Sequence, residues 1–326
     1  MSRPEKTRGE RDERGGRGGR GGRERAMVPP AEFDSYYGRP VLKKPVWKPL
    51  DIAGYLFLGG LAGGSSALAA GAGACGCPGL ARPLRVGALC AIGLSLVALV
   101  HDLGRPGRFV NMLRVVKPTS PMSVGSWLLA GYVPLAGAAA ASTVTGRLPR
   151  LGAAAGAGAA VLGTGVCTYT AVLIADTAVP SWHDGHRELP FAFGGSAVSA
   201  AAGLGLLAAP VAQNGPARRA AAFGAALELA ATRLMTGRMG LSAEPLHTGR
   251  AGRLMRAAEL LTGVGAAIAL AAGHRDRRVA AAAGAALLAG SAALRFGIFL
   301  GGVRSAEDPK YTVLPQRERM AARPAG

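Results

Sequence analysis

Apolar runs of about 20 residues recur along nearly the whole chain, separated by shorter polar connections. A helix of about 20 apolar residues crosses the ~30 Å hydrocarbon core of a bilayer. A soluble protein of 326 residues does not bury so many runs of this length. The pattern therefore predicts an all-α polytopic membrane protein with eight transmembrane helices, at about residues 50–74, 83–101, 124–146, 151–180, 190–212, 217–235, 255–273 and 279–302.

The polar ends of the chain divide it further. Residues 1–26 are an Arg/Gly-rich tail of low complexity that we expect to be disordered. Residues 27–49 are a juxtamembrane arm, because lysines and aromatic residues beside an apolar run are typical of a membrane interface. The eight-helix membrane domain then spans residues 50–303, and residues 304–326 form a C-terminal tail.

The net charge is +19, from 38 Lys and Arg and 19 Asp and Glu. Most of this charge lies in connections beside apolar segments, so the expected partner is the lipid bilayer and not nucleic acid. Eight spans place both termini on one side, together with the connections 102–123, 181–189 and 236–254. This side carries more Lys and Arg than the other, which predicts a multi-pass protein of the cell membrane with cytoplasmic termini.

Cysteine and histidine are placed unfavourably for metal binding. The four cysteines form no CxxC pair, and the five histidines lie in connections or at a span end. A haem in a membrane bundle needs axial ligands inside the spans. We therefore expect no metal site, haem or iron–sulfur cluster in this chain.

Ionisable residues within the spans gather in the half nearest the termini. Such residues are costly in a membrane and usually functional. One interpretation gives proton transfer to Asp102, Asp176, Glu228 and Glu259. The alternative is structural, with the pairs Glu228–Arg233 and Glu259–Arg295 locking helices together.

The stretch from His101 to Tyr132 is the longest polar interruption in the apolar body. It combines a His-Asp pair with several cations and three prolines, which is more than a simple turn between two helices needs. We interpret it as a functional surface, on which basic residues would attract an acidic partner. The residues assigned to partner docking are Arg108, Arg114 and Lys117.

Two segments, HDLGRPGRFVNMLRVVKPTSPMSVGSW and YTAVLIADTAVPSWHDGHRELPFAFGGSA, resemble the polysulfide reductase/NrfD family of membrane subunits. The resemblance covers about residues 30–310. It implies an eight-helix subunit arranged as two four-helix bundles without haem. Such a subunit anchors a ferredoxin-like iron–sulfur protein and, through it, a molybdopterin catalytic subunit. It also exchanges electrons with a quinone, either menaquinone or ubiquinone.

The resemblance also suggests site residues. Tyr169 matches the family's tyrosine that contacts the quinone, and His101, Asp102 and Arg105 match the motif beside the iron–sulfur partner, so we expect these four residues at the quinone site. His101 would exchange protons near neutral pH, with Asp102 fixing its tautomer or relaying the proton. The family's polar contacts on the first helix have only weak substitutes here, namely Asp51, Tyr55 and Ser65.

Other functions stay open at this point. The chain is either a quinone-reactive or a non-catalytic subunit of an oxidoreductase complex. A pure membrane anchor would need no quinone chemistry. An ion or solute transporter would also explain the charged half of the bundle, but the sequence has no clear internal repeat and no matched pair of broken helices.

Overall fold

The computed structural model describes residues 41–103 and 107–321, and within these residues the regular elements are helices without any strand. This confirms the all-α prediction. The elements are α1 (Pro49–Ala74), α2 (Pro78–Leu103), α3 (Gly107–Met112), α4 (Pro121–Thr145), α5 (Pro149–Ala175), α6 (Pro180–Asp184), α7 (Leu189–Ala208), η2 (Val211–Gln213), α8 (Gly215–Arg238), η3 (Gly240–Ala243), α9 (Glu244–His247), α10 (Gly249–Ala271), α11 (Arg277–Glu307) and α12 (Lys310–Ala321).

Seven helices of the described part are long and apolar enough to cross a membrane: α1, α2, α4, α5, α7, α10 and α11. The helix α8 coincides with the sixth expected span but is not among them. Its 24 residues include Arg218, Arg219, Glu228 and Arg233, which lower its hydropathy. Seven of the eight expected spans therefore coincide with helices that are long and apolar enough to cross a membrane, and the sixth stays a prediction.

The fourth expected span, 151–180, is too long at its C-terminal end. The helix α5 ends at Ala175, and Asp176 is its C-cap residue. Pro180 begins the separate short helix α6, and the residue before it is extended, as the residue before a proline prefers. The prediction that Asp176 lies inside a span is therefore wrong, and its side chain is exposed.

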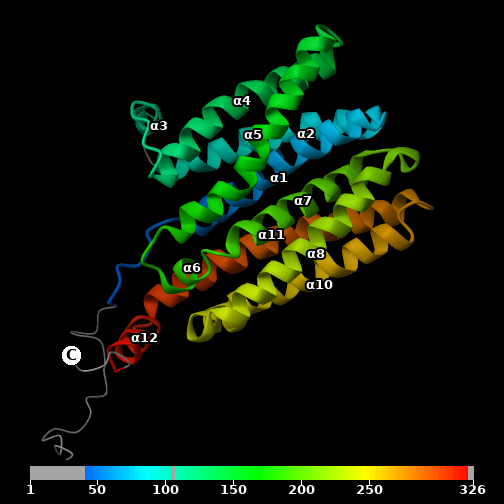
Figure 1. Ribbon diagram of the computed structural model, residues 1–326. Coiled ribbons are helices and arrows are strands. Elements are labelled where there is room, and N and C mark those ends of the chain that lie inside the picture. The colour runs from blue at the N-terminus through cyan, green and yellow to red at the C-terminus, as the bar shows by residue number, and fades with distance from the viewer. Residues whose placement is uncertain (1–40, 104–106, 322–326) are drawn as a thin grey trace, which may run out of the picture. The chain divides into compact units, whose positions relative to one another are not determined.

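Small residues bring α1 into backbone contact with its neighbours. The helix packs against α2, α5 and α7 (Figure 1). A Cβ atom placed on Gly163 of α5 would lie 2.8 Å from the carbonyl oxygen of Gly63. A Cβ atom placed on Gly64 would lie 2.5 Å from the carbonyl oxygen of Ala197 on α7. The GGLAGG sequence of α1 thus provides the close-packing face expected of small residues four apart.

The second half of the chain packs in the same way. The helix α7 contacts α8 and α11, and α10 contacts α11 and α8. A Cβ atom placed on Gly203 of α7 would lie 2.6 Å from the carbonyl oxygen of Gly284 on α11. Because α1 contacts α11 and α7 as well as α2 and α5, the division into two four-helix bundles stays a prediction.

An aromatic stack joins the arm before α1 to this second half. The rings of Trp47 and Trp182 stack with centroids 5.9 Å apart, and Phe299 of α11 packs on Trp182 at 5.6 Å. The indole Nε1 of Trp182 donates a hydrogen bond of 2.9 Å to the carbonyl oxygen of Ile298. Trp47 is therefore fixed in position next to the N-terminus of α1.

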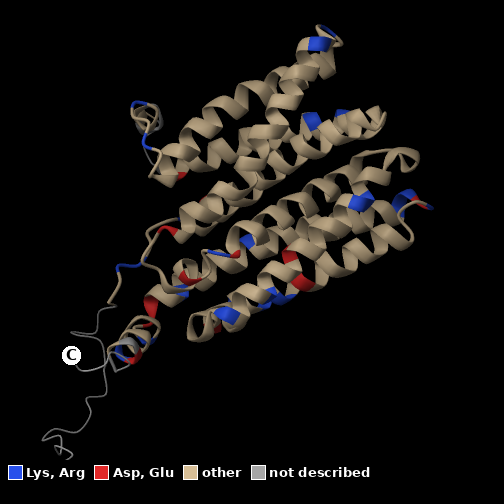
Figure 2. Cartoon of the chain, in the orientation of Figure 1, with Lys and Arg blue, Asp and Glu red and all other residues tan. Residues whose placement is uncertain are grey.

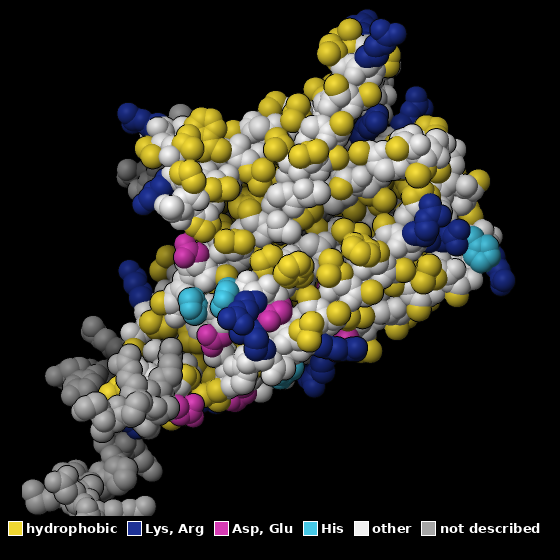
Figure 3. All heavy atoms as spheres, viewed as in Figure 1, with side chains coloured by type: hydrophobic (Ala, Val, Ile, Leu, Met, Phe, Trp, Pro, Cys, Tyr) yellow, Lys and Arg dark blue, Asp and Glu magenta, His cyan; other side chains and the backbone are white. Residues whose placement is uncertain are grey.

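Charged residues are concentrated at the helix ends, while the helix middles carry few (Figure 2). The visible face in Figure 3 has hydrophobic side chains along its middle and basic side chains toward the ends. The middle of α8 and α10 departs from this pattern, because acidic and basic residues lie there together (Figure 2). This distribution is typical of a membrane protein with a polar site between two of its helices.

Candidate functional site

Two buried tyrosines from different helices meet in the first half of the chain. The hydroxyl groups of Tyr55 on α1 and Tyr169 on α5 share a hydrogen bond. Tyr169 was expected to be a site residue, whereas Tyr55 was only a weak substitute for the first-helix contacts. The structure makes Tyr55 the direct partner of Tyr169.

Both tyrosines line a pocket of about 120 Å³ between α1, α2, α4 and α5. Asp102 of α2 also lines it, so two of the predicted quinone-site residues share this pocket. Most of the remaining wall is apolar, and it consists of Trp47, Ile52, Leu56, Leu99, Met112, Met122, Gly125, Ser126, Leu129, Leu173 and Ile174. The arrangement offers hydrogen-bonding groups to a ligand whose body is hydrophobic.

Gly125 explains how the Tyr169 ring fits against α4. A Cβ atom at this position would collide with the ring of Tyr169, including its Cδ2 atom at 2.7 Å. Gly125 belongs to the PMSVGSW segment that carries the family resemblance, but the residue pattern alone did not predict this contact.

The side chains of the neighbouring residues His101 and Asp102 bond to different partners. His101 Nδ1 donates a hydrogen bond of 2.8 Å to Asp51 Oδ2, and the His101 side chain is 64% exposed. Asp102 Oδ1 instead accepts a hydrogen bond of 3.3 Å from the backbone amide of Lys48. The hypothesis that Asp102 fixes the His101 tautomer is therefore wrong, since Asp51 occupies that role. His101 does not line the tyrosine pocket.

The predicted docking residues follow α2. Arg105 lies outside the described residues, and Arg108 is described only as a backbone position in α3. Arg114 and Lys117 are exposed. Their connection is held against α4, because Ser123 Oγ accepts a 3.0 Å hydrogen bond from the Lys117 amide and donates one of 3.0 Å to the Val115 carbonyl oxygen. Trp127 Nε1 also donates to that oxygen at 3.4 Å.

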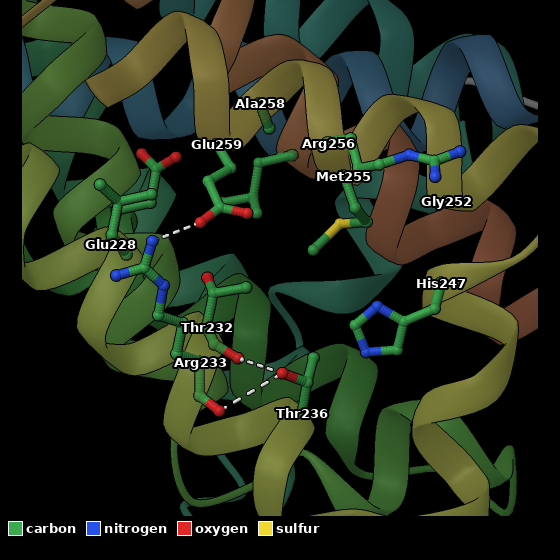
Figure 4. Close-up of a pocket in the computed structure, with 12 residues that line it drawn as sticks. Glu228, Thr232, Arg233, Thr236, His247, Gly252, Met255, Arg256, Ala258 and Glu259 are labelled. Atoms are coloured by element: carbon green, nitrogen blue, oxygen red, sulfur yellow. Dashed lines mark hydrogen bonds and ion pairs between the residues drawn. The ribbon is translucent and has the colours of Figure 1, made fainter. Parts of the chain in front are cut away.

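The predicted proton carriers Glu228 and Glu259 lie elsewhere, in a cavity of about 270 Å³ between α8 and α10 (Figure 4). Neither of the expected ion pairs is present. Arg233 pairs with Glu259, whereas Arg295 donates to the carbonyl oxygen of Phe193 at 2.7 Å and stacks on its ring. The alternation of residues along single helices could not show which side chains of α8, α10 and α11 face one another.

Within the described residues, no group of three or more His, Cys, Asp or Glu side chains is arranged to hold a metal ion. His183 of α6 and His186 in the turn after it lie with ring centroids 5.8 Å apart, and His186 Nδ1 donates a hydrogen bond of 2.8 Å to the His183 carbonyl oxygen.

The comparison with protein families supplies what the geometry leaves open. The family model of polysulphide reductase, NrfD, matches residues 41–304. This chain belongs to the NrfD family. The match covers all seven apolar helices almost completely and both segments that carry the resemblance. No curated protein sequence matches the chain.

Membership of the NrfD family implies a multi-pass membrane subunit of a respiratory oxidoreductase complex. The tyrosine pocket lies within the matched region, as does the Glu228 cavity. Family membership thus gives the class of protein, whereas the roles of the tyrosine pocket and the Glu228 cavity have to be argued from their residues.

Proposed function

We propose that this NrfD-family chain exchanges electrons with a quinone that binds between Tyr55 and Tyr169. It would also anchor a ferredoxin-like iron–sulfur subunit and, through it, a molybdopterin catalytic subunit. The observation that carries the proposal is the pairing of two buried phenol groups inside an apolar pocket.

The residues of the pocket fit a quinone head group. The phenol hydroxyl groups of Tyr55 and Tyr169 are donors for a carbonyl oxygen, and they lie together in a mostly apolar pocket. Leu129, Leu173 and Ile174 would contact the ring and its isoprenoid chain. A bound quinone would supply reversible transfer of two electrons and two protons.

Protein groups near the pocket can handle the protons. Asp102 lines the pocket and is partly exposed, so its carboxylate can accept a proton on one side and release it to water on the other. The exposed His101 and its hydrogen-bonded partner Asp51 provide a second group that can exchange protons with water. Asp176, exposed at the end of α5, would serve only at the surface.

Basic groups close to this pocket support a docking role. They are exposed and would attract an acidic iron–sulfur partner toward the face nearest the pocket. By the positive-inside rule they also favour a cytoplasmic position for this face of the cell membrane. The described residues concerned are Lys43, Lys44, Lys48, Arg114 and Lys117, of which Lys44 is also paired with Glu307 and Lys48 with Asp51.

The test uses the native complex, purified in mild detergent with its lipids. Tyr55→Phe and Tyr169→Phe should each lower the amount of quinone that copurifies and slow quinone-linked electron transfer, while the iron–sulfur subunit stays bound. Tyr132→Phe is the matched control, because Tyr132 is also a buried tyrosine, bonds Ser66 at 2.8 Å and does not line the pocket.

Loss of quinone in the control as well would indicate a general packing effect. An iron–sulfur partner without stoichiometric quinone would instead support the pure anchor. A chain that purifies with neither would overturn both readings and favour the transporter.

A further inference from the structure

The cavity between α8 and α10 contains a buried carboxyl group that the quinone proposal does not use. This cavity, called the Glu228 cavity below, shares no lining residue with the tyrosine pocket. It lies in the halves of α8 and α10 that are nearest their connection, which contains η3 and α9. Its walls carry the polar side chains of Glu228, Thr232, Arg233, Thr236, His247, Arg256 and Glu259 (Figure 4).

Glu228 is the innermost acidic group of the cavity and is only 1% exposed. Its Oε1 atom accepts a hydrogen bond of 3.0 Å from Thr262 Oγ1 of α10. Its Oε2 atom has no hydrogen-bond partner among the described residues, and neither does Thr232 Oγ1 one turn later. A buried carboxylate oxygen without a partner is expensive, so this oxygen is expected to meet water or to carry a proton.

Arg295 of α11 supplies the counter-charge on the inner side. It is fully buried and close enough to interact electrostatically with Glu228. It is not in direct contact with the carboxylate, because its described hydrogen bond goes to Phe193 and its Nε and Nη1 atoms have no described partner. Glu228 therefore has a fixed positive charge behind it and a polar cavity in front of it.

We propose that Glu228 is a proton-exchanging site, loaded from the aqueous side that carries the α8–α10 connection. In this step a hydronium ion in the cavity transfers its proton to Glu228 Oε2 and leaves as water. A polar cavity of about 270 Å³ has room for the water molecules that this requires.

The other charged groups around Glu228 come from four elements. They are Arg233 of α8, His247 of α9, Arg256 and Glu259 of α10, and Arg295 of α11. The pair formed by Arg233 and Glu259 stands beside the Glu228 carboxylate (Figure 4). Because these two charges neutralise each other, Arg256 and Arg295 are the cations that remain around the Glu228 carboxylate.

The first experiment is infrared difference spectroscopy on the purified complex in lipid. A pH change over roughly pH 5 to 9, the range of buried carboxyl groups, should reveal a reversible carbonyl band of a protonated carboxylic acid. Glu228→Gln should abolish this band. Glu244→Gln is the matched control, since it removes a partly exposed carboxyl group that is already paired, with Lys310, and does not line the cavity, and it should keep the band.

A second pair of variants tests whether protons reach Glu228 through the cavity. Thr236→Trp places a large side chain in the cavity and should slow the shift of the band after transfer to heavy water. Leu234→Trp adds the same side chain to an exposed position of α8 that does not line the cavity, and it should leave the exchange rate unchanged.

A titrating band that survives in Glu228→Gln, or the absence of any such band, would overturn the proposal and leave Glu228 as a structural group in one charge state. Equal exchange rates in Thr236→Trp and the parent protein would overturn the route. These readouts need no quinone, so Tyr169→Phe should keep the band even where it lowers quinone binding.

Discussion

Gly125 on α4 lies directly against the ring of Tyr169 on α5, with no room for a methyl group between them. The position of the Tyr169 hydroxyl group beside Tyr55 therefore depends on a residue that carries no side chain. This contact gives a test of the tyrosine pocket that leaves both tyrosines in place.

Gly125→Ala should displace the Tyr169 ring and slow quinone-linked electron transfer in membranes. Gly137→Ala is the matched control on the same helix, because the nearest atom to its added Cβ, Leu89 Cδ1, is 4.0 Å away. Both variants should assemble with the iron–sulfur partner. Equal electron-transfer rates in the two variants would contradict the assigned position of Tyr169.

The second prediction concerns the ion pair between Glu188, just before α7, and Arg238 at the end of α8. Arg238 Nε and Nη2 donate to the two carboxylate oxygens of Glu188 at 2.7 and 2.6 Å. The hydrogen bonds from Arg238 lower the pKa of Glu188 below its ordinary value. A lowered pKa in the folded state stabilises the protein above the unfolded-state pKa, and this contribution is lost as the pH falls through the folded-state value.

Glu188→Gln should therefore lower the free energy of unfolding at neutral pH by up to about 1 kcal/mol, the range of partly exposed pairs. The difference from the parent protein should shrink as acid protonates Glu188. Thermal unfolding in detergent at neutral and acidic pH measures both values. A difference that does not change with pH would show that the carboxylate charge is not what stabilises this connection.

The third prediction compares two arginines near the Glu228 cavity. Arg233 is 71% exposed in its pair with Glu259, so Arg233→Met should change the free energy of unfolding by about 0–1 kcal/mol. Arg295 is fully buried, and Arg295→Met leaves Glu228 without its counter-charge. Arg295→Met also removes the hydrogen bond to the Phe193 carbonyl oxygen, and losing a hydrogen bond made by a charged group costs about 1.5–3 kcal/mol.

Unfolding in detergent of the two variants at neutral pH measures this contrast. Adding Glu228→Gln to Arg295→Met should recover part of the lost stability, because the uncompensated carboxylate is then removed. Similar losses for the two single variants would mean that Arg295 is less buried, or Glu228 less charged, than the structure indicates.

The sequence pattern was sufficient for the membrane helices, because each is a long apolar run between polar connections. It failed where helix ends depend on local backbone geometry, as at Asp176, which the chain turn before Pro180 places outside α5. It also could not decide α8, which it assigned as a span, because of the charges on this helix only Glu228 is buried, where α8 packs against α7 and α10.

The candidate sites were only partly predictable for the same reason. Tyr169 and Asp102 were found through their motifs, and the structure does bring them into one pocket. His101 pairs with Asp51 and not with Asp102, and Arg233 pairs with Glu259 and not with Glu228. These pairings depend on how helices distant in sequence face each other. No spacing within one helix determines that orientation.

The fourth prediction tests the close approach of α1 and α7. Gly64→Ala would place a Cβ atom 2.5 Å from the carbonyl oxygen of Ala197, so the helices must separate. The expected loss is about 1–3 kcal/mol in the free energy of unfolding, the cost of overpacking a tight interface. Gly54→Ala is the control on the same helix, because no atom lies within 4 Å of its added Cβ. That variant should be neutral or more stable by up to about 1 kcal/mol, since alanine favours the helix. The free energies of unfolding of both variants are measured in the same detergent. Equal values would mean that α1 and α7 have room to adjust.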